Sequence, residues 1–83
     1  RSTLSRRLRE MKAATREEVP PVEVDLDVLR AVERLSVQQR SAVYLTYWAD
    51  LTPDEVAARM GVSTGTVKRH LARARKRLGE WLA

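Results

Sequence analysis

The last twenty residues of the chain carry a concentration of positive charge. Residues 64–83 contain six basic residues and one acidic residue, whereas residues 19–63 contain four basic and seven acidic ones. When residues 63–83 are projected as an α-helix, apolar and cationic side chains fall on opposite sides. The cationic side displays Gly65, Arg69, Ala72, Arg73 and Lys76, with Thr66, Lys68 and Arg75 on its flanks.

This cationic side is suited to contact with nucleic acid. An α-helix fits the major groove of B-form DNA, and the N-terminal half of such a helix reaches the base edges. Gly65 and Ala72 remove bulk there, so Lys68, Arg69 and Arg73 can extend past a closely placed backbone. Basic residues on a helix more often form a solvated surface than a nucleic-acid interface. The element that precedes this helix in the sequence decides between the two interpretations.

A short capped helix and a tight turn precede the basic helix. Thr52 is a good N-cap, and Glu55 stands three residues later, where its carboxylate can reach back to the Thr52 amide. Gly61 can adopt the left-handed backbone conformation that ends an α-helix, and Ser63, a second N-cap candidate, follows just two residues later. The second helix must therefore leave at a steep angle, which predicts a helix-turn-helix over residues 52–82.

The middle of the chain predicts two further helices and no strand. Asp25 or Asp27 can cap a first helix of about ten residues with an apolar stripe. Ser36, with Gln39 at the capping-box position, begins a second helix whose apolar residues cover more than one face. We therefore expect an all-α, compact four-helix domain over residues 25–83, ending in the long basic helix.

The N-terminal part predicts a separate basic segment and a linker. Residues 1–18 carry six basic and three acidic residues, and their thin apolar stripe of Leu4, Leu8 and Met11 is too small to stabilise an isolated helix. Residues 19–24 contain two consecutive prolines, which exclude helix and indicate a linker. Because the chain begins with arginine rather than methionine, we expect it to be a fragment of a longer protein.

Several classes of protein are disfavoured by composition. Without cysteine, nothing indicates a disulfide-stabilised secreted protein, and no apolar stretch approaches the roughly 20 residues that span a membrane. The expected location is cytoplasmic, without membrane association. The single histidine, His70, has no partners for a zinc site, and we interpret it as a partly buried packing residue. No cofactor, metal site or catalytic constellation is expected, so an enzyme is improbable.

A series of short motifs runs from Leu35 to the end of the basic helix. They are Leu35-Ser36, Gln39-Arg40, Val43 to Leu45, Tyr47-Trp48, Leu51-Thr52, Glu55-Val56-Ala57, Gly61-Val62-Ser63, Gly65-Thr66-Val67-Lys68 and Arg73 to Leu78. This series resembles domain four, the C-terminal domain, of bacterial RNA polymerase sigma factors, particularly the extracytoplasmic-function group. Trp48 and Arg69-His70 depart mildly from the family pattern, which affects the expected DNA preference.

The resemblance implies a set of DNA contacts. In this family, domain four binds the minus-35 promoter element through its last helix. By position, the residues that would face bases are Lys68, Arg69, Ala72 and Arg73. Those that would hold phosphates, partly through amides at helix N-termini, are Arg40, Thr52, Ser63, Thr64, Thr66 and Lys76.

The resemblance also implies protein partners. Besides double-stranded promoter DNA, the family's domain four binds the flap of the RNA polymerase β subunit. Many such factors are held inactive by an anti-sigma protein, and the sequence leaves open whether one binds here. Residues 1–12 would be the last basic helix of sigma domain two, an extension of the resemblance that is loose.

Two alternatives remain at this point. The TVKRHL stretch, residues 66–71, is close to the recognition helix of LuxR-type DNA-binding output domains, which dimerise on palindromic DNA. The longer basic continuation and the VYLTYWADLT lead-in favour the sigma interpretation. The second alternative is a protein-interaction module whose basic helix is solvated or faces an acidic partner, without sequence-specific DNA binding.

Overall fold

The computed structural model describes residues 6–9 and 25–82, and every regular element in that part of the chain is helical. Residues 6–9 form one helical turn. The longer elements are α2 (Leu26–Glu33), α3 (Val37–Val43), the π-helix η1 (Tyr44–Trp48), α4 (Pro53–Met60) and α5 (Thr64–Leu82). Because η1 continues α3, these elements correspond to the four predicted helices, and the all-α prediction is confirmed.

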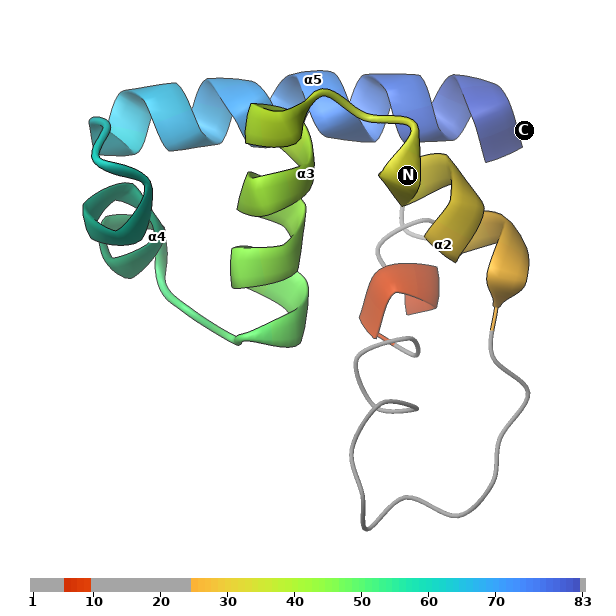
Figure 1. The fold of residues 1–83 in the computed structure, drawn as a ribbon, viewed down its shortest axis with the longest axis horizontal. Coiled ribbons are helices and arrows are strands. Elements are labelled where there is room, and N and C mark those ends of the chain that lie inside the picture. The colour runs from red at the N-terminus through yellow and green to blue at the C-terminus, as the bar shows by residue number, and fades with distance from the viewer. Residues whose placement is uncertain (1–5, 10–24, 83) are drawn as a thin grey trace, which may run out of the picture.

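The longest helix, α5, organises the arrangement. Its 19 residues run along the whole width of the molecule, and α2, α3 and α4 all pack against it from the same side (Figure 1). The residues that face these helices are Val67, Leu71, Ala74 and Leu78, each at most 5% exposed. The predicted core side of the basic helix is thereby confirmed, and the other side of α5 is left uncovered by these three helices.

The helix starts follow the predicted capping residues. Of the two candidates for α2, Asp25 is the cap, because its Oδ1 accepts the Val28 amide at 3.2 Å. Ser36 caps α3 by accepting the Gln39 amide at 3.2 Å. The reciprocal half of the predicted capping box is replaced there, since Gln39 Oε1 accepts a bond from Arg77 Nη1 at 3.4 Å.

The second predicted helix changes pitch before it ends. Its α-helical part stops at Val43, and Tyr44–Trp48 continue as a π-helix whose last bond joins the Ala49 amide to the Tyr44 carbonyl at 3.0 Å. Asp50 then takes a positive φ of 61°, a conformation that Asp tolerates better than most side chains. The sequence predicts one regular helix here, because apolar spacing alone does not specify an extra residue within a turn.

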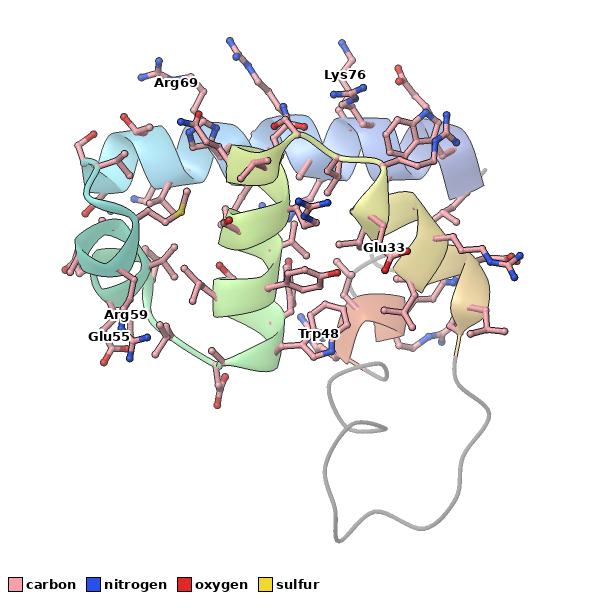
Figure 2. The ribbon with its side chains drawn as sticks, in the orientation of Figure 1. Glu33, Trp48, Glu55, Arg59, Arg69 and Lys76 are labelled. Carbon is pink, nitrogen blue, oxygen red and sulfur yellow. The ribbon has the colours of Figure 1, made fainter. Side chains whose placement is uncertain are left out.

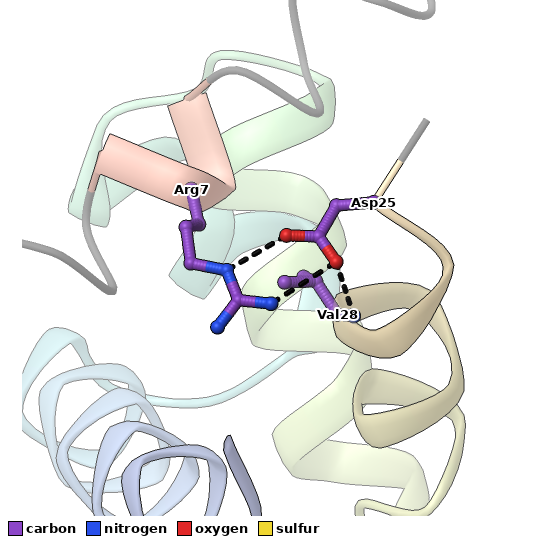
Figure 3. A network of polar contacts seen from close by, with 3 residues as sticks. All are labelled: Arg7, Asp25 and Val28. Atoms are coloured by element: carbon purple, nitrogen blue, oxygen red, sulfur yellow. Dashed lines mark hydrogen bonds and ion pairs between the residues drawn. The ribbon is translucent and has the colours of Figure 1, made fainter. Parts of the chain in front are cut away.

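Residues 6–9 pack onto the domain beside α2 (Figure 3). Leu8 is fully buried in the core, and Arg7 forms two bonds to the Asp25 carboxylate, from Nε at 2.7 Å and from Nη2 at 3.1 Å. The hydrogen bond from Arg7, together with the Val28 amide, holds the pKa of Asp25 below its ordinary value. The predicted linker at 19–24 and the rest of the basic segment lie outside the described residues.

Candidate nucleic-acid interface

The turn between α4 and α5 is fixed by bonds between neighbouring residues. Thr52 Oγ1 accepts the Glu55 amide at 3.2 Å while Glu55 Oε1 accepts the Thr52 amide at 2.8 Å, which is the predicted capping box. Gly61 ends α4 at a φ of 70°, and Ser63 Oγ accepts the Thr66 amide at 3.1 Å at the start of α5. These local bonds set the direction in which α5 leaves α4.

Small apolar residues bring the two helices of the turn together. Val56 and Ala57 of α4 and Val67 of α5 are 0%, 6% and 0% exposed. On the outside, Thr64 Oγ1 donates to Asp54 Oδ1 at 2.7 Å, which joins the first turns of α4 and α5. The two helices therefore form the predicted helix-turn-helix, with a buried apolar contact between them and a hydrogen bond between their first turns.

The uncovered side of α5 carries the four residues predicted to face bases. Lys68, Arg69, Ala72 and Arg73 are all exposed. Figure 2 shows Arg69 and Lys76 extending from α5 away from the other helices. The four residues are thus presented together on one surface, with the small Ala72 among three cations, and their contact with bases stays a prediction.

Four of the predicted phosphate contacts adjoin this surface. Lys76 is exposed on it, while Ser63, Thr64 and Thr66 form the N-terminal end of α5. Ser63 Oγ and Thr66 Oγ1 lie 2.9 Å apart and bond to each other. Because the Thr64 hydroxyl already donates to Asp54, only its backbone amide remains suited to an anion.

The two other predicted phosphate contacts belong to α3 and to the start of α4 rather than to α5, and both have partners within the protein. Arg40 Nη1 donates to the Glu33 carbonyl at 3.3 Å and so binds the end of α2. Thr52 is occupied by its capping box with Glu55, which lies on the side of α4 farthest from Arg69 (Figure 2). Both assignments stay predictions. Of the two, Thr52 fits less well with an interface centred on the cationic side of α5.

Three contacts of the basic helix were missed by sequence reasoning. Arg75, placed on the flank of the cationic side, bonds the Tyr47 hydroxyl through Nη2 at 2.9 Å. The Trp81 ring has the Arg34 Cζ 4.2 Å from its centroid and the Arg77 Cζ 5.0 Å from it. No sequence signal marked the pairs of Arg75 with Tyr47 and of Arg34 with Trp81, because each joins residues that are far apart in the chain. Arg77 and Trp81 are four residues apart on α5, a spacing that places them side by side on the helix.

The described residues contain no group of three or more side chains that could hold a metal ion. In the same part of the chain, no helix is both long and apolar enough to cross a membrane. His70 is half-buried, as predicted, and its Nε2 atom is buried without a hydrogen-bond partner among the described residues.

Comparison with known families identifies the same stretch. The model of the family described as sigma-70, region 4 matches residues 25–78. That range contains α2, α3, η1 and α4, together with most of α5. No solved structure gives a significant match.

Several curated proteins are similar to the chain. An RNA polymerase sigma-E factor of Streptomyces avermitilis is 35% identical over 88 residues, which cover 92% of this chain and 48% of that protein. The ECF RNA polymerase sigma factor SigM of Mycobacterium tuberculosis is 41% identical over 86 residues, covering 92% of this chain and 44% of its own length. The chain thus spans less than half of these relatives. It belongs to the sigma-70 region 4 family, in the group of ECF sigma factors.

Proposed function

We propose that this chain recognises promoter DNA in transcription initiation, as the domain of an ECF sigma factor that reads the minus-35 element. The observation that carries the proposal is the exposed side of α5, where Lys68, Arg69, Ala72 and Arg73 are all exposed and Arg69 extends away from the packed helices (Figure 2). In this reading α5 enters the major groove, and Arg69 and Arg73 hydrogen-bond base edges. The protein then acts by binding, without catalysing a reaction.

The charge distribution supports this orientation. Residues 64–83 have a formal balance of +5 from six basic residues and one acidic one, whereas residues 19–63 have a balance of −3 from four and seven. DNA phosphates attract the first region and repel the second, so the chain approaches DNA with α5 in front. The affinity therefore falls steeply as salt increases.

The same proposal includes RNA polymerase as a partner. The curated relatives are named RNA polymerase sigma factors, and the resemblance to domain four implies a contact with the flap of the β subunit. The helices that pack against α5 carry exposed apolar side chains. Leu26 of α2 is 55% exposed, and Val37 of α3 is 67% exposed. Such side chains suit a protein partner, either the polymerase flap or an anti-sigma protein. This role places the protein in the cytoplasm.

The test is selection of a binding sequence from a randomised duplex pool by the 83-residue chain, at low and at moderate salt. We expect an asymmetric motif of about one half-turn to one turn of DNA. The Arg69→Ala, Arg73→Ala double variant loses that preference, because each arginine that pairs with guanine contributes about five- to hundredfold of discrimination.

Arg59→Ala is the matched control. It removes one positive charge, half of what the double variant removes, from an exposed position on α4 far from the outer side of α5 (Figure 2), and should select the same motif as the unchanged chain. A palindromic motif would point to a dimeric reader of the LuxR type. Absence of any motif, with the fold intact, would overturn the proposed function in favour of a protein-interaction module.

A further inference from the structure

Three arginines gather where α2 and α3 meet the C-terminal half of α5. Arg34 follows α2, Arg40 lies in α3 and Arg77 lies in α5, and we call these three residues with Trp81 the arginine corner. Arg40 has been considered above as a phosphate contact. Arg34 belongs to no motif of the family resemblance, whereas Arg77 falls within the motif Arg73 to Leu78, and the DNA contacts predicted from the sequence assign a role to neither.

The guanidinium groups of the corner are held by neutral partners. Arg34 and Arg77 lie 4.2 and 5.0 Å from the centroid of the Trp81 ring, Arg77 also donates to the Gln39 amide oxygen at 3.4 Å, and Arg40 donates to a backbone carbonyl. Within residues 6–9 and 25–82, none of the three forms an ion pair. Their positions are therefore restricted, while no described carboxylate lies within ion-pair distance of them.

Arg77 extends the cationic surface of α5 toward the C-terminal end of the helix. Arg69, Arg73 and Arg77 follow one another at intervals of four residues, so each lies one turn beyond the last on neighbouring parts of the helix surface. Arg77 is exposed and lies about 12 Å along the axis from Arg69, at 1.5 Å per residue. The major groove is itself about 12 Å wide. A helix that crosses the groove with Arg73 near its middle therefore brings Arg77, about 6 Å further along the axis, to the border, where the phosphates are.

We propose that Arg34 and Arg77 bind the DNA phosphate backbone that borders the minus-35 element, as an extension of the interface that reads no bases. This inference rests on the proposed function and adds a second set of contacts to it. Trp81 supplies the platform that keeps both guanidinium groups at the surface, since a planar guanidinium stacks on an aromatic face while its N–H groups stay available to an anion. The contribution is to affinity and register rather than to sequence choice.

Among the described residues, the acidic side chains near the arginine corner form no ion pair with it. Glu80 lies one turn beyond Lys76 and Arg77 on α5 but forms no ion pair among the described residues. Glu33 precedes Arg34 and points away from the outer side of α5 (Figure 2). A surface hollow of about 440 Å³ beside the corner is lined by Arg7, Arg30, Arg34, Asp27 and Trp81 among others, so the surroundings are also predominantly cationic.

The experiment measures binding of the 83-residue chain to the selected motif and to a scrambled duplex across a series of salt concentrations. Arg34→Ala and Arg77→Ala should each weaken binding about five- to tenfold at 0.1 M salt, to both duplexes alike, and lower the slope of log affinity against log salt by about 0.9. Arg77→Lys should retain most of the binding, because the charge is kept. Arg59→Ala, an exposed arginine of α4, should leave affinity and slope unchanged.

A second measurement locates the contact. On a duplex that ends at the motif, the Arg34→Ala, Arg77→Ala double variant should bind as well as the unchanged chain, because the bordering phosphates are missing. On a duplex extended on both sides, only the unchanged chain should gain affinity. Circular dichroism of each variant checks that the fold is intact.

The failures of the two proposals are distinguishable. If the unchanged chain selects a motif while the variants keep its affinity and salt slope, the corner does not bind DNA and this inference is overturned alone. If the variants instead lose binding to RNA polymerase core at unchanged DNA affinity, the corner takes an acidic protein surface. If the unchanged chain selects no motif, the proposed function fails and takes this inference with it.

Discussion

The two ends of α5 are held in place by different kinds of contact. At its N-terminal end, the hydrogen bonds of the turn join residues three to ten positions apart, such as Ser63 with Thr66 and Thr64 with Asp54. Towards its C-terminal end, Arg75 reaches Tyr47 across 28 positions and Arg77 reaches Gln39 across 38. The first set can form before the rest of the domain packs, whereas the second requires α3 and η1 to be in place.

This difference indicates a division of work along one helix. The end proposed to read bases takes its direction from short-range bonds and is therefore insensitive to what the rest of the domain binds. The end proposed to contact bordering phosphates depends on the packing of α2, α3 and the turn at residues 6–9. A partner that disturbs those elements would change affinity for DNA before it changed the preferred sequence.

The largest expected effect is on protein stability, and it comes from residues 6–9, on whose packing the C-terminal end of α5 depends. Leu8 is fully buried although it belongs to the N-terminal turn, so Leu8→Ala should lower the free energy of unfolding by about 2–5 kcal/mol in a urea titration. Leu26→Ala, at a leucine that is 55% exposed, is the control and should stay within about 0.5 kcal/mol. Equal small effects from both variants would mean that residues 6–9 do not contribute to the core.

The next effect concerns the short-range end. Gly61 has a φ of 70°, and a Cβ built on it meets nothing within 4 Å, so Gly61→Ala should cost only the backbone strain of about 1–2 kcal/mol. Gly79 lies within α5 with equally open surroundings, and Gly79→Ala should stabilise the protein by about 0.5–1 kcal/mol. Thermal unfolding of the two variants should therefore shift in opposite directions, and a shared direction would contradict the assigned turn.

The smallest effect is a pH dependence of the contact that anchors residues 6–9. Because the bond from Arg7 lowers the pKa of Asp25, the folded protein binds a proton there less readily than the unfolded chain, and the ion pair stabilises the fold above the ordinary pKa of 3.8. This stabilisation is lost as the pH falls through the lowered value. With side chains 26% and 30% exposed, it should amount to less than about 1 kcal/mol.

Asp25→Asn tests the sign of this effect. Asparagine keeps the N-cap of α2 but cannot pair as an ion with Arg7, so the variant should be less stable than the unchanged chain at neutral pH. The difference in unfolding free energy should shrink as the pH falls below about 4. A difference in unfolding free energy that grew as the pH was lowered would be incompatible with the ion pair between Arg7 and Asp25.

The same contrast explains how much could be predicted from sequence. The capping residues, Gly61, the core side of α5 and the exposed cationic residues were predictable, because each depends on local spacing or on the helical period. The Arg75 bond to Tyr47 and the stacking of Arg34 on Trp81 were not, since they depend on which distant segments pack together, and apolar spacing alone did not indicate the π-helix. Arg75 in particular resembles a DNA-facing residue until its partner is seen.

The π-helix at Tyr44–Trp48 has a consequence for how the chain tolerates changes in length. Each π-type bond encloses one residue more than an α-type bond, so this segment holds spare backbone between α3 and the connection to α4. Deleting a single residue here would tighten the segment to regular helix, and neither flanking helix would need to move far. An equivalent deletion inside α5 would rotate every later side chain by about 100° and turn Arg77 and Trp81 away from their present neighbours.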